Sequence, residues 1–172
     1  MKTFRHILLL LSISLGLASC GVMASRKMVP QMAILSSKPD LSKYKYVYIT
    51  PTPEKTSVTG GTYGNQYGVY GSTSSKSIIP SDVIAGSFMK HGFVRIPEIN
   101  DAQKAQTIVV NYGESGRKNY GLLGAYSIEV TIQLLDATTY ELICSSTAEG
   151  MGATETDDVR EATLKCLNAI FQ

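Results

Sequence analysis

The chain has 172 residues, of which 44% are hydrophobic and 17% are charged, and its formal net charge is +2. This composition fits one folded domain and excludes a chain that is disordered throughout or collagen-like. Two basic residues, Lys2 and Arg5, lie in a segment that we expect to be removed, and the remaining basic and acidic residues are equal in number. This balance excludes a strongly basic nucleic-acid-binding protein, so we expect no nucleic-acid partner.

Residues 1–19 have the three parts of a secretory signal peptide. Lys2 and Arg5 form a cationic start, residues 7–17 form an apolar stretch, and Ala18 and Ser19 are small residues at its end. The apolar stretch would span about half of the hydrocarbon core of a bilayer. A removed signal is therefore favoured over a permanent membrane-spanning helix.

Residues 17–20 read Leu-Ala-Ser-Cys. They resemble the lipobox of bacterial lipoproteins, in which the cysteine is acylated and becomes the first residue of the mature chain. The resemblance implies that Cys20 carries fatty acyl chains, such as palmitate, which anchor the protein stably when two or three are present. Ordinary signal cleavage near an incidental Cys20 is the alternative. Gly21 stands where members kept in the inner membrane often carry aspartate, so we expect the outer membrane, with the protein on its periplasmic face.

Residues 20–41 show no sustained periodicity and contain Pro30 and Pro39, so we expect a tether between the lipid and a single domain over 42–172. The segment 44–50 alternates between two faces and predicts a strand. In the segment 56–77, seventeen of twenty-two residues are Gly, Ser, Thr or Tyr. We expect a long loop or an irregular hairpin there.

The rest of the chain predicts two helices and four further strands. Pro80 and Gly92 suit the start and the end of a helix. Segments 93–96, 107–112, 128–134 and 140–148 predict strands, and the third has the clean alternation of a sheet with one buried face. Residues from 154 onward predict a closing helix with one apolar face. We therefore expect an α+β, two-layer domain, in which one mostly antiparallel sheet of about five strands carries two helices on one face.

The segment 106–171 resembles the α/β envelope domains typified by the TolB N-terminal domain, the lipoprotein activators of penicillin-binding proteins and the CsgG-like proteins. The resemblance rests on residues 107–111, on Leu-Leu-Asp-Ala-Thr at 134–138, on residues 142–149 and on Asp-Asp-Val-Arg at 157–160. It departs from the family pattern where Thr139 and Tyr140 replace a glycine. The resemblance implies a non-enzymatic module that docks on other envelope proteins.

The residues for catalysis or metal binding are few. His91 is the only histidine after the signal peptide, and its place at a predicted helix end suits a structural cation. Acidic residues gather at the start of the closing helix, where they suit the helix dipole better than a calcium loop. We expect no enzyme activity, no cofactor and no metal. Cys144 and Cys166 would form either a disulfide between strand and helix or, as we favour, two buried thiols.

Two segments combine glycine with tyrosine, a composition that is enriched in recognition surfaces. The candidate interaction residues of 56–77 and 113–125 are Tyr63, Tyr67, Tyr70, Arg117, Lys118 and Tyr120. We expect a protein-interaction module whose partners are the membrane, through the lipid, and another envelope protein. A solvated hairpin that binds no partner would have the same composition. Binding of a small ligand or glycan by the same tyrosines is the alternative function.

Overall fold

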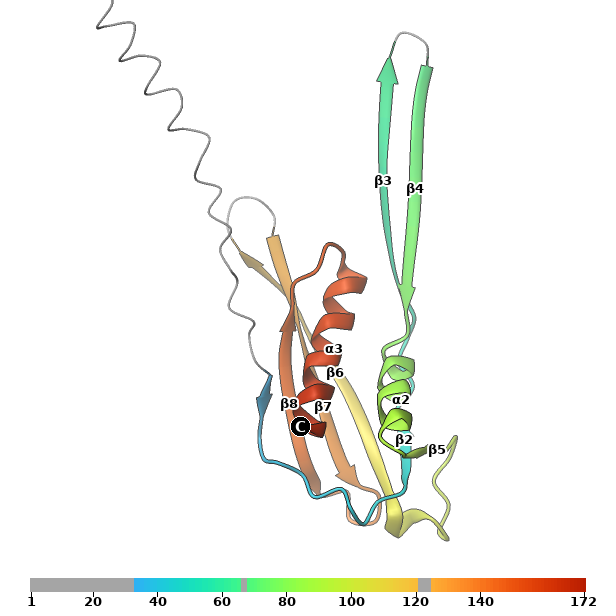
Figure 1. The fold of residues 1–172 in the computed structure, drawn as a ribbon, viewed down its shortest axis with the longest axis vertical. Coiled ribbons are helices and arrows are strands. Elements are labelled where there is room, and N and C mark those ends of the chain that lie inside the picture. The colour runs from blue at the N-terminus through green and yellow to red at the C-terminus, as the bar shows by residue number, and fades with distance from the viewer. Residues whose placement is uncertain (1–32, 66–67, 121–124) are drawn as a thin grey trace, which may run out of the picture. The chain divides into compact units, whose positions relative to one another are not determined.

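The computed structural model describes residues 33–65, 68–120 and 125–172, so the predicted signal peptide, Cys20 and Tyr67 lie outside the described residues. The described residues belong to a single unit, Met32–Gln172. This unit is α+β, with a six-stranded sheet, two helices and a separate two-stranded hairpin (Figure 1).

The six-stranded sheet has the order β1-β8-β7-β6-β2-β5. Its strands are β1 (Ile34–Leu35), β2 (Tyr46–Ile49), β5 (Val94–Arg95), β6 (Thr107–Tyr120), β7 (Ala125–Asp136) and β8 (Leu142–Gly150). The neighbours β6, β7, β8 and β1 are antiparallel, whereas β2 pairs in parallel with both β5 and β6.

The expectation of one mostly antiparallel sheet of about five strands is therefore wrong in strand number and in strand direction. The chain leaves β2, passes through a hairpin and a helix, and returns in the same direction as β5, as parallel neighbours require. The alternation within a four-residue strand says which side chains are buried. It carries no information on the direction of the neighbouring strand.

The strand β1 lies within the segment 20–41 that we expected to be a tether. Ile34 and Leu35 pair with Thr147 and Ser146 of β8, and the Ser36 N–H donates to the Ser145 carbonyl at 2.9 Å. The sheet therefore includes residues that precede position 42.

The segment 56–77 is neither a loop nor irregular. It forms the hairpin of β3 (Lys55–Asn65) and β4 (Gly68–Ile78), which pair without interruption from Lys55 with Ile78 to Asn65 with Gly68. The segment 113–125 is likewise mostly strand, since β6 runs to Tyr120 and β7 begins at Ala125. A register shift between Glu114 and Arg117 places Gly116 at a φ of +89°, which glycine adopts without strain.

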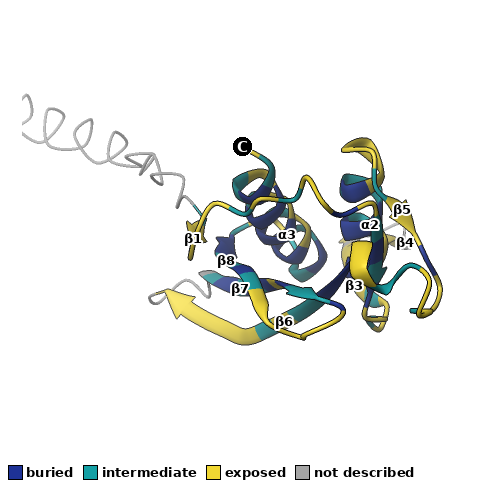
Figure 2. Cartoon of the chain, turned by 90° about the horizontal axis from the view of Figure 1, so that it is seen from below, coloured by how far each residue is buried: buried dark blue, intermediate teal, exposed yellow. Residues whose placement is uncertain are grey.

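The helices α2 (Pro80–Lys90) and α3 (Glu155–Phe171) agree with the predicted ones. They contact each other and lie on one face of the sheet (Figure 2). The core between the layers contains the alternating residues of β7 and the expected apolar face of α3, and all of these are almost fully buried. They are Ile128, Val130, Ile132, Leu134, Val159, Ala162, Cys166 and Ile170.

Candidate functional site

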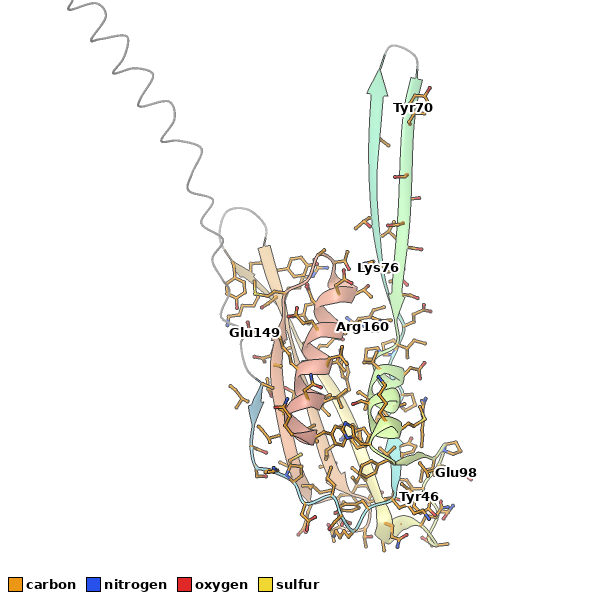
Figure 3. All side chains as sticks on the ribbon, in the orientation of Figure 1. Tyr46, Tyr70, Lys76, Glu98, Glu149 and Arg160 are labelled. Carbon is orange, nitrogen blue, oxygen red and sulfur yellow. The ribbon has the colours of Figure 1, made fainter. Side chains whose placement is uncertain are left out.

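The β3–β4 hairpin is exposed along most of its length. Every residue from 58 to 62 and from 70 to 77 is exposed, and the hairpin forms a sheet of its own (Figure 1). The Tyr70 side chain is 63% exposed and lies near the start of β4, at the end of the hairpin that is farthest from the helices (Figure 3). Tyr63 is its cross-strand partner by register, although the Tyr63 side chain is not among the described ones.

Hydrogen bonds hold the base of the hairpin against the first turn of α3. The Ser57 hydroxyl accepts from the Thr156 backbone N–H at 3.0 Å and lies 2.6 Å from the Thr156 hydroxyl. Thr156 is itself almost buried, with 5% of its surface exposed. The start of α3 is capped by Thr154, whose hydroxyl accepts from the Asp157 N–H. The base is therefore tied to a helix end that already has its own cap.

Ion pairs surround these hydrogen bonds. The Lys55 ammonium lies 2.6 Å from the Glu114 carboxylate and 3.5 Å from that of Glu155, which also pairs with Arg117. The Lys76 ammonium lies 3.1 Å from the Asp157 carboxylate on α3. The hydrogen bond from Arg117 holds the pKa of Glu155 below its ordinary value, and the charges of Arg117 and Lys55 add to this effect.

We call this group the hairpin-base cluster. It joins the hairpin, the strand β6 and the start of α3, and its members are Lys55, Ser57, Lys76, Glu114, Arg117, Glu155, Thr156 and Asp157. Each individual surface ion pair contributes little, but a network around a buried hydroxyl fixes the direction in which the hairpin leaves the domain.

A second group of contacts lies on Glu149 of β8, whose residue surface is only 8% exposed. Its carboxylate accepts from the Tyr120 hydroxyl at 2.7 Å, from the Lys118 ammonium at 3.1 Å and from the Ser127 hydroxyl at 3.2 Å. The hydrogen bond from Tyr120, aided by Lys118, holds the pKa of Glu149 below its ordinary value although burial opposes this.

The structure therefore does not bring the candidate interaction residues into one place. Tyr70 lies far out on the hairpin, whereas Glu149, whose carboxylate accepts from Lys118 and Tyr120, lies on β8 of the six-stranded sheet (Figure 3). Arg117, Lys118 and Tyr120 are all exposed, but their polar groups bind carboxylates of the same chain. Each of these three residues therefore has a structural contact within its own chain.

The acidic residues at the start of α3 have partners that the sequence analysis did not identify. We expected Glu155 and Asp157 to act on the helix dipole, and in the structure they also bind basic residues of β3, β4 and β6. One signal could have indicated this: residues 20–118 are mainly basic, and residues 119–172 are mainly acidic. Among the described residues, no group of His, Cys, Asp and Glu is arranged to hold a metal ion.

His91 and the two cysteines have structural surroundings. His91 follows the last turn of α2, as expected, and its ring stacks on Phe171 with the ring centres 3.9 Å apart. Cys144 and Cys166 are free and buried, and the Cys166 thiol donates to the Val130 carbonyl at 3.4 Å. Burial raises the pKa of both thiols to about 11, so neither is an activated nucleophile at neutral pH.

Comparisons with known proteins give no family. No family model matches the chain, and no curated protein matches it. Two solved structures of the PelC dodecamer from Paraburkholderia phytofirmans, one of them a single-substitution variant, are similar to it. The variant is 17% identical over 82% of this chain and 94% of its own, with a TM-score of 0.47. The other is 16% identical over 81% of this chain and 95% of its own, also with a TM-score of 0.47.

Neither helix within the described ranges combines the length and the apolar character that are needed to cross a membrane.

Proposed function

We propose that this chain is a lipoprotein anchored through Cys20 to the outer membrane of a bacterial envelope, where it acts as a non-enzymatic protein-interaction module on the periplasmic side. The signal peptide and the Leu-Ala-Ser-Cys sequence at 17–20 support the anchor. The β3–β4 hairpin supports the interaction role, and it is the docking element in this proposal.

One observation carries the proposal: a regular hairpin of two eleven-residue strands is exposed along most of its length, and the described contacts that tie it to the rest of the domain lie near its base. A two-stranded hairpin with no packed face is at best marginally stable in water. Burial of its tyrosine side chains and backbone against a partner would supply the missing packing, and tyrosine is among the residues that contribute most at interfaces.

The experiment is a pull-down of the full-length chain from crosslinked envelopes of its host. Replacing Tyr70 by alanine, alone and together with Tyr63 and Tyr67, should reduce the recovered partner about tenfold, as expected for the loss of an interface tyrosine. Tyr140→Ala is the matched control, because Tyr140 is exposed to a similar extent, 59% against 63%, but lies in the turn before β8. An unchanged partner in the hairpin variants would contradict the proposal.

Binding of a small ligand or glycan is the alternative, and the described residues favour it less. A shallow hollow of about 430 Å³ on the hairpin is lined by Thr59, Gly60, Gly61, Ser72, Thr73 and Ser74. None of these residues offers an aromatic ring on which a sugar could stack. A rise in melting temperature with cell-wall fragments, which Tyr140→Ala retains and Tyr70→Ala loses, would favour this alternative instead.

A further inference from the structure

The outer edges of the β3–β4 hairpin are open. Each of its strands pairs with the other and with no further strand among the described residues. In an antiparallel pair, every second residue directs its backbone N–H and C=O away from the partner strand. Each edge of the hairpin therefore presents a row of backbone donors and acceptors to its surroundings.

The features by which natural proteins usually protect such edges are missing from this segment. Protected edges carry lysine or proline, are interrupted by bulges, or are very short. The eleven residue pairs of β3 and β4 show no register shift, and no proline or charged residue occurs between Val58 and Ser75. The hairpin has the length and regularity of an edge that accepts another strand.

Two glycines of the hairpin each leave room for a threonine of the opposite strand. A Cβ atom at Gly60 would lie 2.8 Å from the Thr73 methyl group, and one at Gly71 would lie 3.1 Å from the Thr62 methyl group. Each threonine therefore occupies the space above the glycine of the opposite strand. These two pairs favour the observed register of the hairpin. At these two pairs, no bulky side chain covers the edges of the hairpin.

No charge opposes a second copy of the same chain as the occupant of this edge. When identical strands pair, each charged side chain approaches another of the same sign, which is destabilising. The segment 56–75 has no charged side chain, and the flanking Lys55 and Lys76 are already paired with acidic residues of their own chain. Pairing between copies therefore meets no like-charge repulsion in this segment.

We propose that the β3–β4 hairpin pairs edge to edge with the same hairpin of a second copy of this chain, so that two ribbons form one four-stranded sheet. This inference rests on the proposed function, in which the hairpin is the docking element. It adds that the partner of the hairpin is a second copy of the same protein. Backbone hydrogen bonds between the edges supply the affinity, as in other recognition by strand addition.

The test compares charge variants at Ser72, which is exposed and lies opposite Gly61, so that a longer side chain meets none across the ribbon. Full-length copies labelled with ¹⁵N are mixed with unlabelled copies in mild detergent at low ionic strength. Both carry the photocrosslinker p-benzoylphenylalanine in place of Tyr70. At about 0.01 M salt the Debye length is about 30 Å, so charges on neighbouring ribbons interact in any register.

Self-pairing predicts mixed-isotope dimers joined through the hairpin peptides in the parent protein and in the neutral control Ser72→Gln. Ser72→Glu alone and Ser72→Lys alone should each give about fivefold less dimer. A mixture of the Glu and Lys copies should restore the yield, because opposite charges on paired copies attract each other. Binding to a different protein would not be restored by mixing the two variants. Equal yields from all variants would overturn the pairing.

The two proposals fail in different ways. If purified copies give no mixed-isotope dimer but the same probe captures a different protein in host envelopes, the self-pairing is wrong and the docking role of the hairpin stands. If neither product forms, both proposals are wrong.

Discussion

Asp136 shows how one residue at the end of β7 connects distant parts of the chain. Its carboxylate accepts from the Tyr44 hydroxyl at 2.8 Å, from the Lys43 ammonium at 3.1 Å and from the Thr138 N–H at 2.8 Å. Burial alone would raise the pKa of Asp136, but these hydrogen bonds, led by the one from Thr138, hold it well below its ordinary value. The charged form is therefore the one that the fold stabilises.

The lowered pKa makes the stability of the domain depend on pH. A depressed carboxyl pKa contributes stability above the pKa of the unfolded chain, about 4, and this contribution is lost as the pH falls toward the pKa of the folded state. Asp136→Asn should therefore lower the free energy of unfolding by about 2 kcal/mol at pH 7. The difference from the parent protein should shrink below about pH 4.

Urea unfolding at a series of pH values measures this difference. Asp101→Asn, at an exposed turn position, is the matched control and should behave as the parent protein does throughout. A gap between Asp136→Asn and the parent that stays constant from pH 7 to pH 3 would show that the carboxylate charge is not the stabilising feature.

For single residues, the sequence predicted contacts between near neighbours in the chain better than contacts between residues far apart in it. The turn after Asp136 was predictable from turn residues at 136–139, and its structure contains the Asp136 contacts to the Thr138 and Thr139 N–H groups. In the resemblance to the envelope domains, Thr139 and Tyr140 stand where the family pattern has a glycine. Tyr140 has a left-handed φ of 59°, a conformation that glycine adopts without strain. The bond from Tyr44 was not predictable, because 92 residues separate the two partners and only the folded sheet brings them together.

At the scale of elements, the hairpin-base cluster decides how β3 and β4 are attached. Thr156→Val keeps the shape of this buried side chain but removes the hydroxyl that lies 2.6 Å from the Ser57 hydroxyl. We expect the domain to lose about 1 to 2 kcal/mol of stability, because the Ser57 hydroxyl loses a partner. We also expect faster hydrogen exchange at the base of the hairpin, over residues 55–57 and 76–78.

Chemical unfolding and hydrogen exchange followed by mass spectrometry check both effects. Ser77→Ala removes an exposed hydroxyl from β4 at the base of the same hairpin and should change neither. Exchange at the hairpin base that is the same in Thr156→Val as in the parent would mean that the cluster does not hold the hairpin.

Both helices and most strands of the sheet were predictable, whereas the hairpin was predicted only as one alternative and its regular pairing was not. The period of the apolar residues indicates α3 and β7 because each buries one face. The described side chains from 58 to 62 and from 70 to 77 are exposed on both faces of the hairpin. The sequences of β3 and β4 therefore show no apolar alternation, and their glycines resemble those of a loop. Strand formation there depends on cross-strand neighbours such as Thr73 and Gly60, which only the register defines.

At the scale of the whole chain, the uneven distribution of charge in the sequence is neutralised by folding. Five of the eight ion pairs among the described residues join the mainly basic part, 20–118, to the mainly acidic part, 119–172. The order of the strands could not be predicted from the sequence, because the direction of β2 and the place of β1 depend on long-range pairing. The individual acidic partners of Arg117 and Lys118 were not predictable either, because they lie on α3 and β8, whose positions relative to β6 follow from the fold.

We propose that the hairpin is the part of this protein that contacts a partner. The most direct measurement is photocrosslinking in intact host envelopes, with p-benzoylphenylalanine placed at position 70 in one variant and at position 140 in another. The two positions are similarly exposed but lie on different elements. The account predicts a discrete crosslinked product, a second copy or another protein, from position 70 and none from position 140. Equal labelling from both positions, or none from position 70, would contradict it.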